Sequence, residues 1–201
     1  TLATTRLGQH LHLHQRLTST NSEAMELAQR GAEDGTVVAA ESQTAGRGRH
    51  ARTWFSPPGL NLYCSIIIRG QGHGLSLAEW LSWVPLTTAL AVAEAVRTVA
   101  STSLALKWPN DLLLDERKVG GILCESSLTN PDTPVVVIGI GLNVNVPPDM
   151  FPDELRTIAT SLFESTHRLA FVVSAESPEE SRRLLTVLAP VLRSIAEAAV
   201  F

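Results

Sequence analysis

Apolar and polar positions alternate near the start of the chain. Leu11 and Leu13 alternate with His10, His12 and His14, and this period of two predicts a half-buried strand. The three histidines then share one face. No cysteine or carboxylate lies close by in the sequence, so we interpret them as a solvent-facing row rather than a metal site.

A helix is expected directly after this strand. Thr20 and Glu23 have the spacing of a capping box, in which each side chain bonds to the other residue's backbone N–H. The helix should run to about Arg30 and end at Gly31, because glycine readily adopts the left-handed conformation that closes a helix.

Five short runs of apolar and β-branched residues predict further strands. They are residues 37–41, 60–68, 104–108, 112–114 and 135–140. The last run is continuously β-branched and apolar, as in a central strand buried on both faces. Residues 115–117, Asp-Glu-Arg, indicate a turn, so residues 112–123 are expected to form a hairpin.

Two more helices are expected in the second half of the chain. One should begin near Pro85 and run to about Val99, since proline is well placed in a first turn. Residues 177–180, Ser-Pro-Glu-Glu, form a capping box that should open a second helix to about Ala199. Strands and helices follow one another without regular alternation, which favours an α+β fold.

The bulk composition fits a single globular domain. The 201 residues are 44% hydrophobic and 18% charged, which is ordinary for a globular enzyme. A net charge of −4 argues against a general nucleic-acid binder. Cys64 and Cys124 lie within apolar runs, which favours buried thiols over a disulfide.

Targeting signals are not evident in the sequence. No apolar stretch reaches the ~18 residues of a membrane span, and the first residues lack the basic-then-apolar pattern of a secretory signal. We therefore expect a cytoplasmic protein with no membrane partner. Because the chain begins with Thr1, we expect it to be part of a longer product.

The most distinctive segment is residues 46–54, Gly-Arg-Gly-Arg-His-Ala-Arg-Thr-Trp, called the Arg loop below. Its two glycines disfavour regular structure. Backbone N–H groups and forked guanidinium groups both suit phosphate or carboxylate oxygens, and Trp54 offers a flat surface to an aromatic base. The pattern predicts an anion-binding segment that closes over a ligand.

Three other clusters carry candidate chemistry. Ser19-Thr20-Asn21 lies at the predicted helix start, where an N-cap is the simplest interpretation. Residues 107–111, Lys-Trp-Pro-Asn-Asp, and residues 118–121, Lys-Val-Gly-Gly, are taken together as a second cluster. Residues 139–145, Gly-Ile-Gly-Leu-Asn-Val-Asn, indicate close approach to a strand backbone. They are not a dinucleotide fingerprint, because a third glycine and a following helix are missing.

In this order the four clusters resemble the catalytic domain of biotin protein ligases. The resemblance covers roughly residues 10–163, and the Arg loop together with the Lys-Trp-Pro-Asn-Asp motif is highly specific. It implies a class II synthetase-like fold, α+β with a mixed, largely antiparallel sheet and packed helices. It also implies an enzyme that makes biotinyl-5′-AMP from biotin and ATP, then transfers biotin to one lysine of a biotin carboxyl carrier protein.

The resemblance assigns the site residues. Biotin is expected to contact Ser19, Thr20, Asn21, Gln43, Gly46, Arg47, Gly48, Arg49, Lys118 and Gly120. The nucleotide is expected to contact Arg49, Arg52, Trp54, Lys107, Asn110 and Asn143. Arg47, Arg49 and Lys118 are the expected catalytic groups, because they offset the repulsion between two anionic reactants. Mg²⁺ is expected with the triphosphate, without a carboxylate cage of the protein's own.

The sequence departs from the family pattern in three respects. Ala51 stands where the family usually has glycine, and His50 where it often has a basic residue, so loop closure is expected to differ. No helix-turn-helix precedes the motifs, which argues against an operator-binding form. Residues 177–200 suggest a helix, so the family's small C-terminal β domain is expected to be absent or truncated.

Two rival functions and one assembly stay open. A lipoate protein ligase shares the fold, although a lipoyl ring has no ureido group for Ser19 and Gln43 to pair with. A nucleic-acid-binding module could use the arginines and Trp54 of the Arg loop, but the acidic chain has no second basic stripe. Whether the chain forms a homodimer through a sheet edge is also left open by the sequence.

Overall fold

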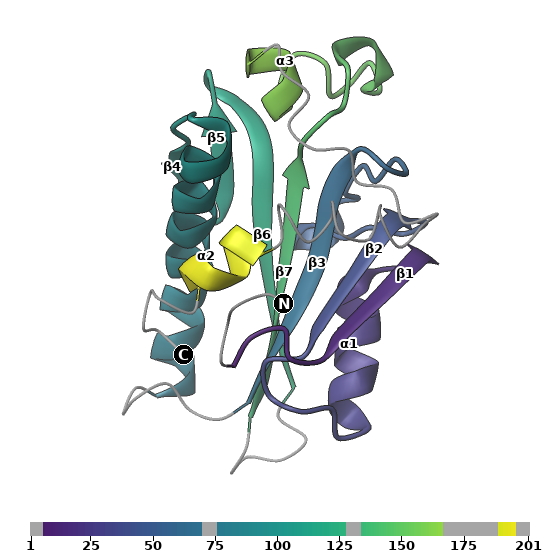
Figure 1. The fold of residues 1–201 in the computed structure, drawn as a ribbon, viewed down its shortest axis with the longest axis vertical. Helices are drawn as coiled ribbons and strands as arrows, with labels where there is room; N and C mark the ends of the chain where they lie inside the picture. Colours follow the sequence, from purple (N-terminus) through teal and green to yellow (C-terminus); the bar gives the residue numbers. More distant parts are fainter. Residues whose placement is uncertain (1–5, 70–75, 128–133, 167–188, 196–201) are drawn as a thin grey trace.

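One sheet with a helix on each face forms the body of the protein (Figure 1). The structure, a computed structural model, describes residues 6–69, 76–127, 134–166 and 189–195. The helices are α1 (Thr20–Gln29), α2 (Leu77–Ala100), the short α3 (Leu162–Thr166) and an unlabelled helical segment at residues 189–195, with 3₁₀ turns at Arg49–Ala51 and Pro148–Met150. The predicted α+β fold is confirmed.

The sheet is mixed but mostly antiparallel, as expected. Its strands are β1 (Leu11–Leu17), β2 (Val37–Gln43), β3 (Asn61–Arg69), β4 (Ala105–Lys107), β5 (Asp111–Leu114), β6 (Arg117–Ser127) and β7 (Val135–Asn143). They lie in the order β1-β2-β3-β7-β6-β5-β4, and only β1 and β2 pair in parallel. The predicted strands all occur, and β7 is central.

Alternation along β7 separates two hydrophobic layers. Val137 packs with Ala28 of α1, whereas Ile138 belongs to the larger cluster that contains Trp80 of α2. Successive residues of a strand point to opposite faces. Gly139 and the odd-numbered positions after it therefore continue the face that carries α1.

Helix α2 begins earlier than the sequence predicted. The expected start near Pro85 is wrong, because Ser76 and Glu79 form a complete capping box upstream of it. Pro85 lies inside the helix, where proline cannot donate the helical hydrogen bond. Trp80 and Val84 are buried in the core, and this burial offsets the cost of the missing bond.

The start of α1 also differs from its prediction. Ser19 is the N-cap, and no side-chain cap hydrogen bond forms, so the Thr20–Glu23 capping box is wrong. The Thr20 N–H instead donates to the side chain of Gln43 at 2.9 Å, since a tertiary partner competes for it. The helix ends as predicted, with Gly31 at a φ of +93°.

Other expectations have mixed outcomes. The hairpin of β5 and β6 is confirmed, and its turn places Asp115 and Glu116 at φ values of 49° and 62°. Of the helix expected over residues 177–199, residues 189–195 are helical and the others lie outside the described residues. None of the described helices is long and apolar enough to cross a membrane.

The histidine row lies mainly in solvent. His10 and His12 are exposed and His14 is half-buried, so the solvent-facing interpretation holds for the first two. His10 Nε2 lies 3.1 Å from a carboxylate oxygen of Glu33. In the described part of the chain, no three His, Cys, Asp or Glu side chains gather as a metal site.

The two cysteines are unbridged, as predicted. Cys64 is completely buried in β3, and burial raises the pKa of its thiol to about 12. At pH 8 this thiol stays protonated and hence unreactive, because the thiolate is the nucleophile.

We therefore expect Cys64 to react with Ellman's reagent only after the protein is unfolded in denaturant. A Cys124→Ser variant isolates the signal of Cys64, and released thionitrobenzoate measures it. Equal reaction rates in the folded and unfolded protein would contradict the buried placement.

Candidate active site

A cavity of about 690 Å³ opens on the sheet face that carries α1. Its size lies within the roughly 300–1,000 Å³ of small-molecule sites. All but two of the predicted site residues line it, namely Ser19, Thr20, Asn21, Gln43, Arg47, Gly48, Arg49, Arg52, Trp54, Lys107, Asn110, Lys118 and Asn143. Segments more than 120 residues apart in sequence, from Ser19 to Asn143, thus meet around one space.

The two exceptions are Gly46 and Gly120. A Cβ at Gly46 would lie 2.7 Å from the carbonyl oxygen of Trp54, within the Arg loop itself. A Cβ at Gly120 would lie 3.0 Å from the side chain of Leu112, which is buried in the core. Since neighbours in a strand face opposite ways, Gly121 lines the cavity instead.

The cavity floor depends on two glycines of β7. A Cβ at Gly139 would lie 2.1 Å from Asn21 Oδ1, and a Cβ at Gly141 would lie 2.7 Å from the Trp54 ring. Neither contact is possible for a residue with a side chain. Each glycine therefore lets one polar or aromatic group approach the strand backbone.

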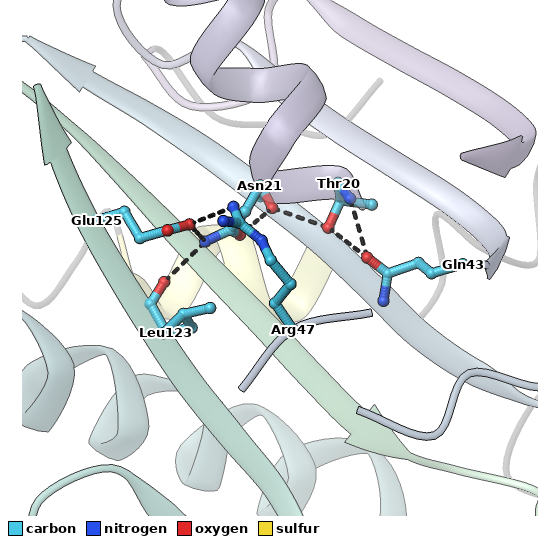
Figure 2. Close-up of polar contacts among 7 residues, drawn as sticks. Thr20, Asn21, Gln43, Arg47, Leu123 and Glu125 are labelled. Carbon is cyan, nitrogen blue, oxygen red and sulfur yellow. Dashed lines mark hydrogen bonds and ion pairs between the residues drawn. The ribbon is translucent and has the colours of Figure 1, made fainter. Parts of the chain in front are cut away.

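Four polar side chains, Thr20, Asn21, Gln43 and Ser65, form what we call the amide pocket. Thr20 N donates to Gln43 Oε1 at 2.9 Å, and Ser65 Oγ donates to Asn21 Oδ1 at 2.6 Å. Figure 2 shows the first three meeting at the start of α1. Ser65 was not predicted, although a serine within the apolar run of β3 was a signal for it.

The Arg loop folds as a small hairpin beside this pocket. Gly48 N donates to the carbonyl of Arg52 at 2.7 Å, and Trp54 N donates to the carbonyl of Gly46 at 2.8 Å. These bonds bring the two ends of the loop together. The arginines and the indole are therefore carried on one folded unit.

The tip of the Arg loop has an unusual backbone. His50 and Ala51 have φ values of 55° and 57°, in the left-handed region that costs a residue with a Cβ roughly 1–2 kcal/mol. Glycine carries no such cost. The expected departure from the family pattern at Ala51 therefore falls at a position where glycine would relieve backbone strain.

Two arginines of the loop reach across to the sheet. Arg47 Nη2 donates to Glu125 Oε2 of β6 at 2.6 Å. Arg49 Nη1 donates to Asn110 Oδ1 at 3.3 Å, from the loop before β5. Glu125 was not predicted as a site residue, because its proximity to Arg47 follows from strand register and not from local sequence.

Lys118 lies where β5, β6 and the Arg loop converge. Its Nζ forms an ion pair with Asp111 at 2.5 Å and lies 5.4 Å from the centroid of the Trp54 ring. The chain contains only two lysines, Lys107 and Lys118, and both line the cavity. Cationic groups thus converge from the loop and from the sheet.

Asn143 serves mainly to brace the end of β7. Its side chain is 4% exposed, its Nδ2 donates to the Thr160 carbonyl at 3.0 Å, and its Oδ1 accepts from Asn61 at 3.4 Å. These bonds occupy both ends of the amide. Its contact with a nucleotide stays a prediction.

An apolar wall completes the cavity and was not predicted. Phe151, Leu155, Ile158 and Ala159 line it from the segment after β7. The ring of Phe151 lies 6.0 Å from that of Phe55, centroid to centroid. Apolar residues spaced three and four apart were the available signal.

Sequence comparison identifies relatives with the same motifs. The chain matches the model of the biotin/lipoate A/B protein ligase family over residues 13–143. It is 42% identical over 164 residues to the bifunctional ligase/repressor BirA of Bacillus subtilis, covering 82% of this chain and 49% of that protein. It is 43% identical over 136 residues to the biotin–acetyl-CoA-carboxylase ligase of Paracoccus denitrificans, covering 67% and 54%. The chain spans about half the length of these relatives.

Structural comparison agrees. The biotin protein ligase of Aquifex aeolicus in complex with biotin and ATP superposes with a TM-score of 0.71 at 32% identity, over 95% of this chain and 70% of that one. The Leishmania major biotin protein ligase in complex with biotinyl-5-AMP gives 0.65 at 26% identity, over 94% and 76%. By fold, motifs and sequence, the chain belongs to the biotin/lipoate A/B protein ligase family.

Proposed function

We propose that the chain is an ATP-dependent biotin ligase. It forms biotinyl-5′-AMP and pyrophosphate, then transfers biotin to a lysine of a biotin carboxyl carrier protein. The observation that carries the proposal is one cavity with an uncharged hydrogen-bonding end, the amide pocket, and a cationic end. The names of the relatives from Paracoccus denitrificans and Aquifex aeolicus support it.

The amide pocket suits the ureido ring of biotin. A ureido group presents two N–H donors and one carbonyl acceptor, and amide and hydroxyl side chains can satisfy both kinds. Ser19, Thr20 and Asn21 are each at most 4% exposed, so their bonds to a ligand form away from water. Hydrogen bonds in such a site contribute more to specificity than exposed ones do.

Lipoate is the second candidate substrate because the family includes both kinds of ligase. Its dithiolane ring has no N–H or carbonyl group to offer Thr20, Asn21 or Gln43. Binding it would desolvate these polar groups without full compensation, at a cost of roughly 1–3 kcal/mol for each group left unpaired. The amide pocket therefore favours biotin.

The cationic end suits the first chemical step. A carboxylate oxygen of biotin attacks the α-phosphorus of ATP, the bond to the β-phosphate breaks, and pyrophosphate leaves. Both reactants are anions, so Arg47, Arg49 and Lys118 act by offsetting their repulsion and stabilising the charge on the phosphoryl oxygens. In the second step the acceptor amine attacks the biotinyl carbonyl, a proton is lost, and AMP leaves.

The nucleotide is assigned to the end of the cavity that carries the Arg loop and Lys118. The proposed contacts are those that the sequence suggested, Arg49, Arg52, Trp54, Lys107, Asn110 and Asn143, and all of them line the cavity. Trp54 offers its ring to adenine, and the apolar wall gives the base a second dry surface. The described residues hold no cluster of three or more metal ligands, so Mg²⁺ would enter on the phosphates.

Biotin-dependent exchange of labelled pyrophosphate into ATP tests the proposal directly. With Mg²⁺ and ATP, we expect exchange with biotin and little with lipoate, because only biotin satisfies the amide pocket. Exchange that depends on lipoate and does not occur with biotin would identify lipoate as the substrate. Exchange with neither acid would refute adenylate formation. Homodimerisation and a cytoplasmic location stay predictions from the sequence.

Removing one cation at the reacting end should slow adenylate formation. We expect Lys118→Ala and Arg49→Ala each to lower the exchange rate by ~10²–10³, the usual effect of losing one preorganised stabilising group. Arg97→Ala is the matched control, because Arg97 lies exposed on α2 and pairs with Glu94. Full rates in both site variants would contradict the charge-offset account.

Filling the cavity floor should weaken biotin binding. In Gly139→Ala the new Cβ must displace Asn21, and leaving a buried polar group unpaired costs roughly 1–3 kcal/mol. We expect biotin Kd, measured by calorimetry without ATP, to rise at least about tenfold. Gly141→Ala should instead displace Trp54 and weaken ATP binding. Unchanged biotin affinity in Gly139→Ala would contradict the interpretation that Gly139 makes room for Asn21 in the biotin site.

A further inference from the structure

Glu125 joins two parts of the site that lie far apart in the chain. One of its carboxylate oxygens, Oε2, accepts hydrogen bonds from Asn21 Nδ2 at 2.8 Å and from Arg47 Nη2 at 2.6 Å (Figure 2). Asn21 lies in the first turn of α1, Arg47 belongs to the Arg loop, and Glu125 lies on β6. One side chain of the sheet thus contacts both the amide pocket and the loop.

The contact with Asn21 determines which end of its amide serves as acceptor. Asn21 Nδ2 donates to the Leu123 carbonyl at 3.2 Å and to Glu125 at 2.8 Å, which uses both N–H groups. An ionised carboxylate can only accept hydrogen bonds, so it pairs with the nitrogen end of the amide. The oxygen end therefore turns toward Ser65 and Gly139.

The contact with Arg47 orders a long cationic side chain. Arg47 is 42% exposed and Glu125 is 30% exposed, so the pair is partly buried, and of the two only Arg47 lines the cavity. A guanidinium has five N–H donors, and the bond to Glu125 is made through Nη2, which leaves donor capacity on the other nitrogens for an anion. An arginine already held in place loses less conformational entropy when a ligand binds.

We propose that Glu125 is a positioning residue, which holds Arg47 over the cavity and keeps the oxygen of Asn21 turned into the amide pocket. This inference rests on the proposed function, because it assigns Asn21 to the ureido ring and Arg47 to the tail and phosphate. Glu125 itself touches neither reactant. It acts by preparing both binding groups before the ligand arrives.

A kinetic comparison of Glu125→Gln with wild type tests the proposal. Glutamine keeps the shape but removes the charge, and it can present an N–H to Asn21 where the carboxylate could only accept. We expect the KM for biotin in pyrophosphate exchange to rise about tenfold, as for a charged hydrogen bond near 1.5 kcal/mol, while the KM for ATP changes less than twofold. Glu125→Asp, which keeps the charge, should recover part of the affinity.

Glu164→Gln is the matched control. Glu164 also pairs with an arginine, Arg117, at 2.6 Å and is 17% exposed, but its side-chain partners, Arg117 and Thr160, belong neither to the amide pocket nor to the Arg loop. The control should leave the KM for biotin unchanged. Equal effects of Glu125→Gln and Glu164→Gln, or equal rises in both KM values, would overturn the positioning role.

A double-mutant cycle separates action through Arg47 from general destabilisation. If Glu125 works partly through Arg47, then Glu125→Gln must raise the KM for biotin by a smaller factor in an Arg47→Ala background than in wild type. If Glu125→Gln raises the KM for biotin by the same factor in both backgrounds, Glu125 does not act through Arg47. Thermal midpoints of all variants show whether each one is folded.

A ligand-free measurement keeps this inference distinct from the proposed function. Trypsin can cut the Arg loop after Arg47, Arg49 or Arg52, and the anchored loop should resist it. We expect Glu125→Gln to speed cleavage there severalfold without any substrate, and Glu164→Gln not to. Unchanged cleavage would overturn the role of Glu125, whereas a wild type without biotin-dependent exchange would overturn the proposed function only.

Discussion

The close approach of other groups to the backbone of β7 is the constraint on which the site depends. Along the face that carries α1, Val137 packs under the helix. The next two positions on this face, Gly139 and Gly141, have no side chain. Asn21 and Trp54 occupy the space that two side chains would otherwise fill. The position of α1, the position of the Trp54 indole and the depth of the cavity all depend on the absence of these two Cβ atoms.

The cavity then divides into two ends of different polarity. At one end, neutral side chains of α1, β2 and β3 hydrogen-bond to one another within a largely buried pocket, where hydrogen bonds are stronger than in water. At the other, the Arg loop and Lys118 bring positive charge against an acidic chain of net charge −4. Glu125 and Asp111 balance two of these cations before any ligand is present. The site thus keeps its charges ordered without an anion.

Local patterns predicted most of the fold, and motifs predicted most of the cavity lining. The predictions that failed concern features that depend on residues distant in the sequence. The start of α2 was predicted near Pro85, but Ser76 and Glu79 cap the helix upstream, and the burial of the first turns outweighs the cost of the proline. The capping box of Thr20 and Glu23 does not form, because the Thr20 N–H donates to Gln43 at the end of β2. Ser65, a serine within an apolar run, carried a local signal, whereas Glu125 reaches Asn21 and Arg47 only through the register of β6 with β7, which no local pattern reveals.

The scarcity of lysine has a consequence for the proposed intermediate. An acyl adenylate acylates amines, and the chain has two lysines against fourteen arginines. Arginine stays protonated at neutral pH and makes a poor nucleophile. Both lysines line the cavity, and Lys118 is held by Asp111. An acyl adenylate that left the cavity would therefore meet no lysine elsewhere on these 201 residues, and the composition of this part of the protein would suppress its self-labelling.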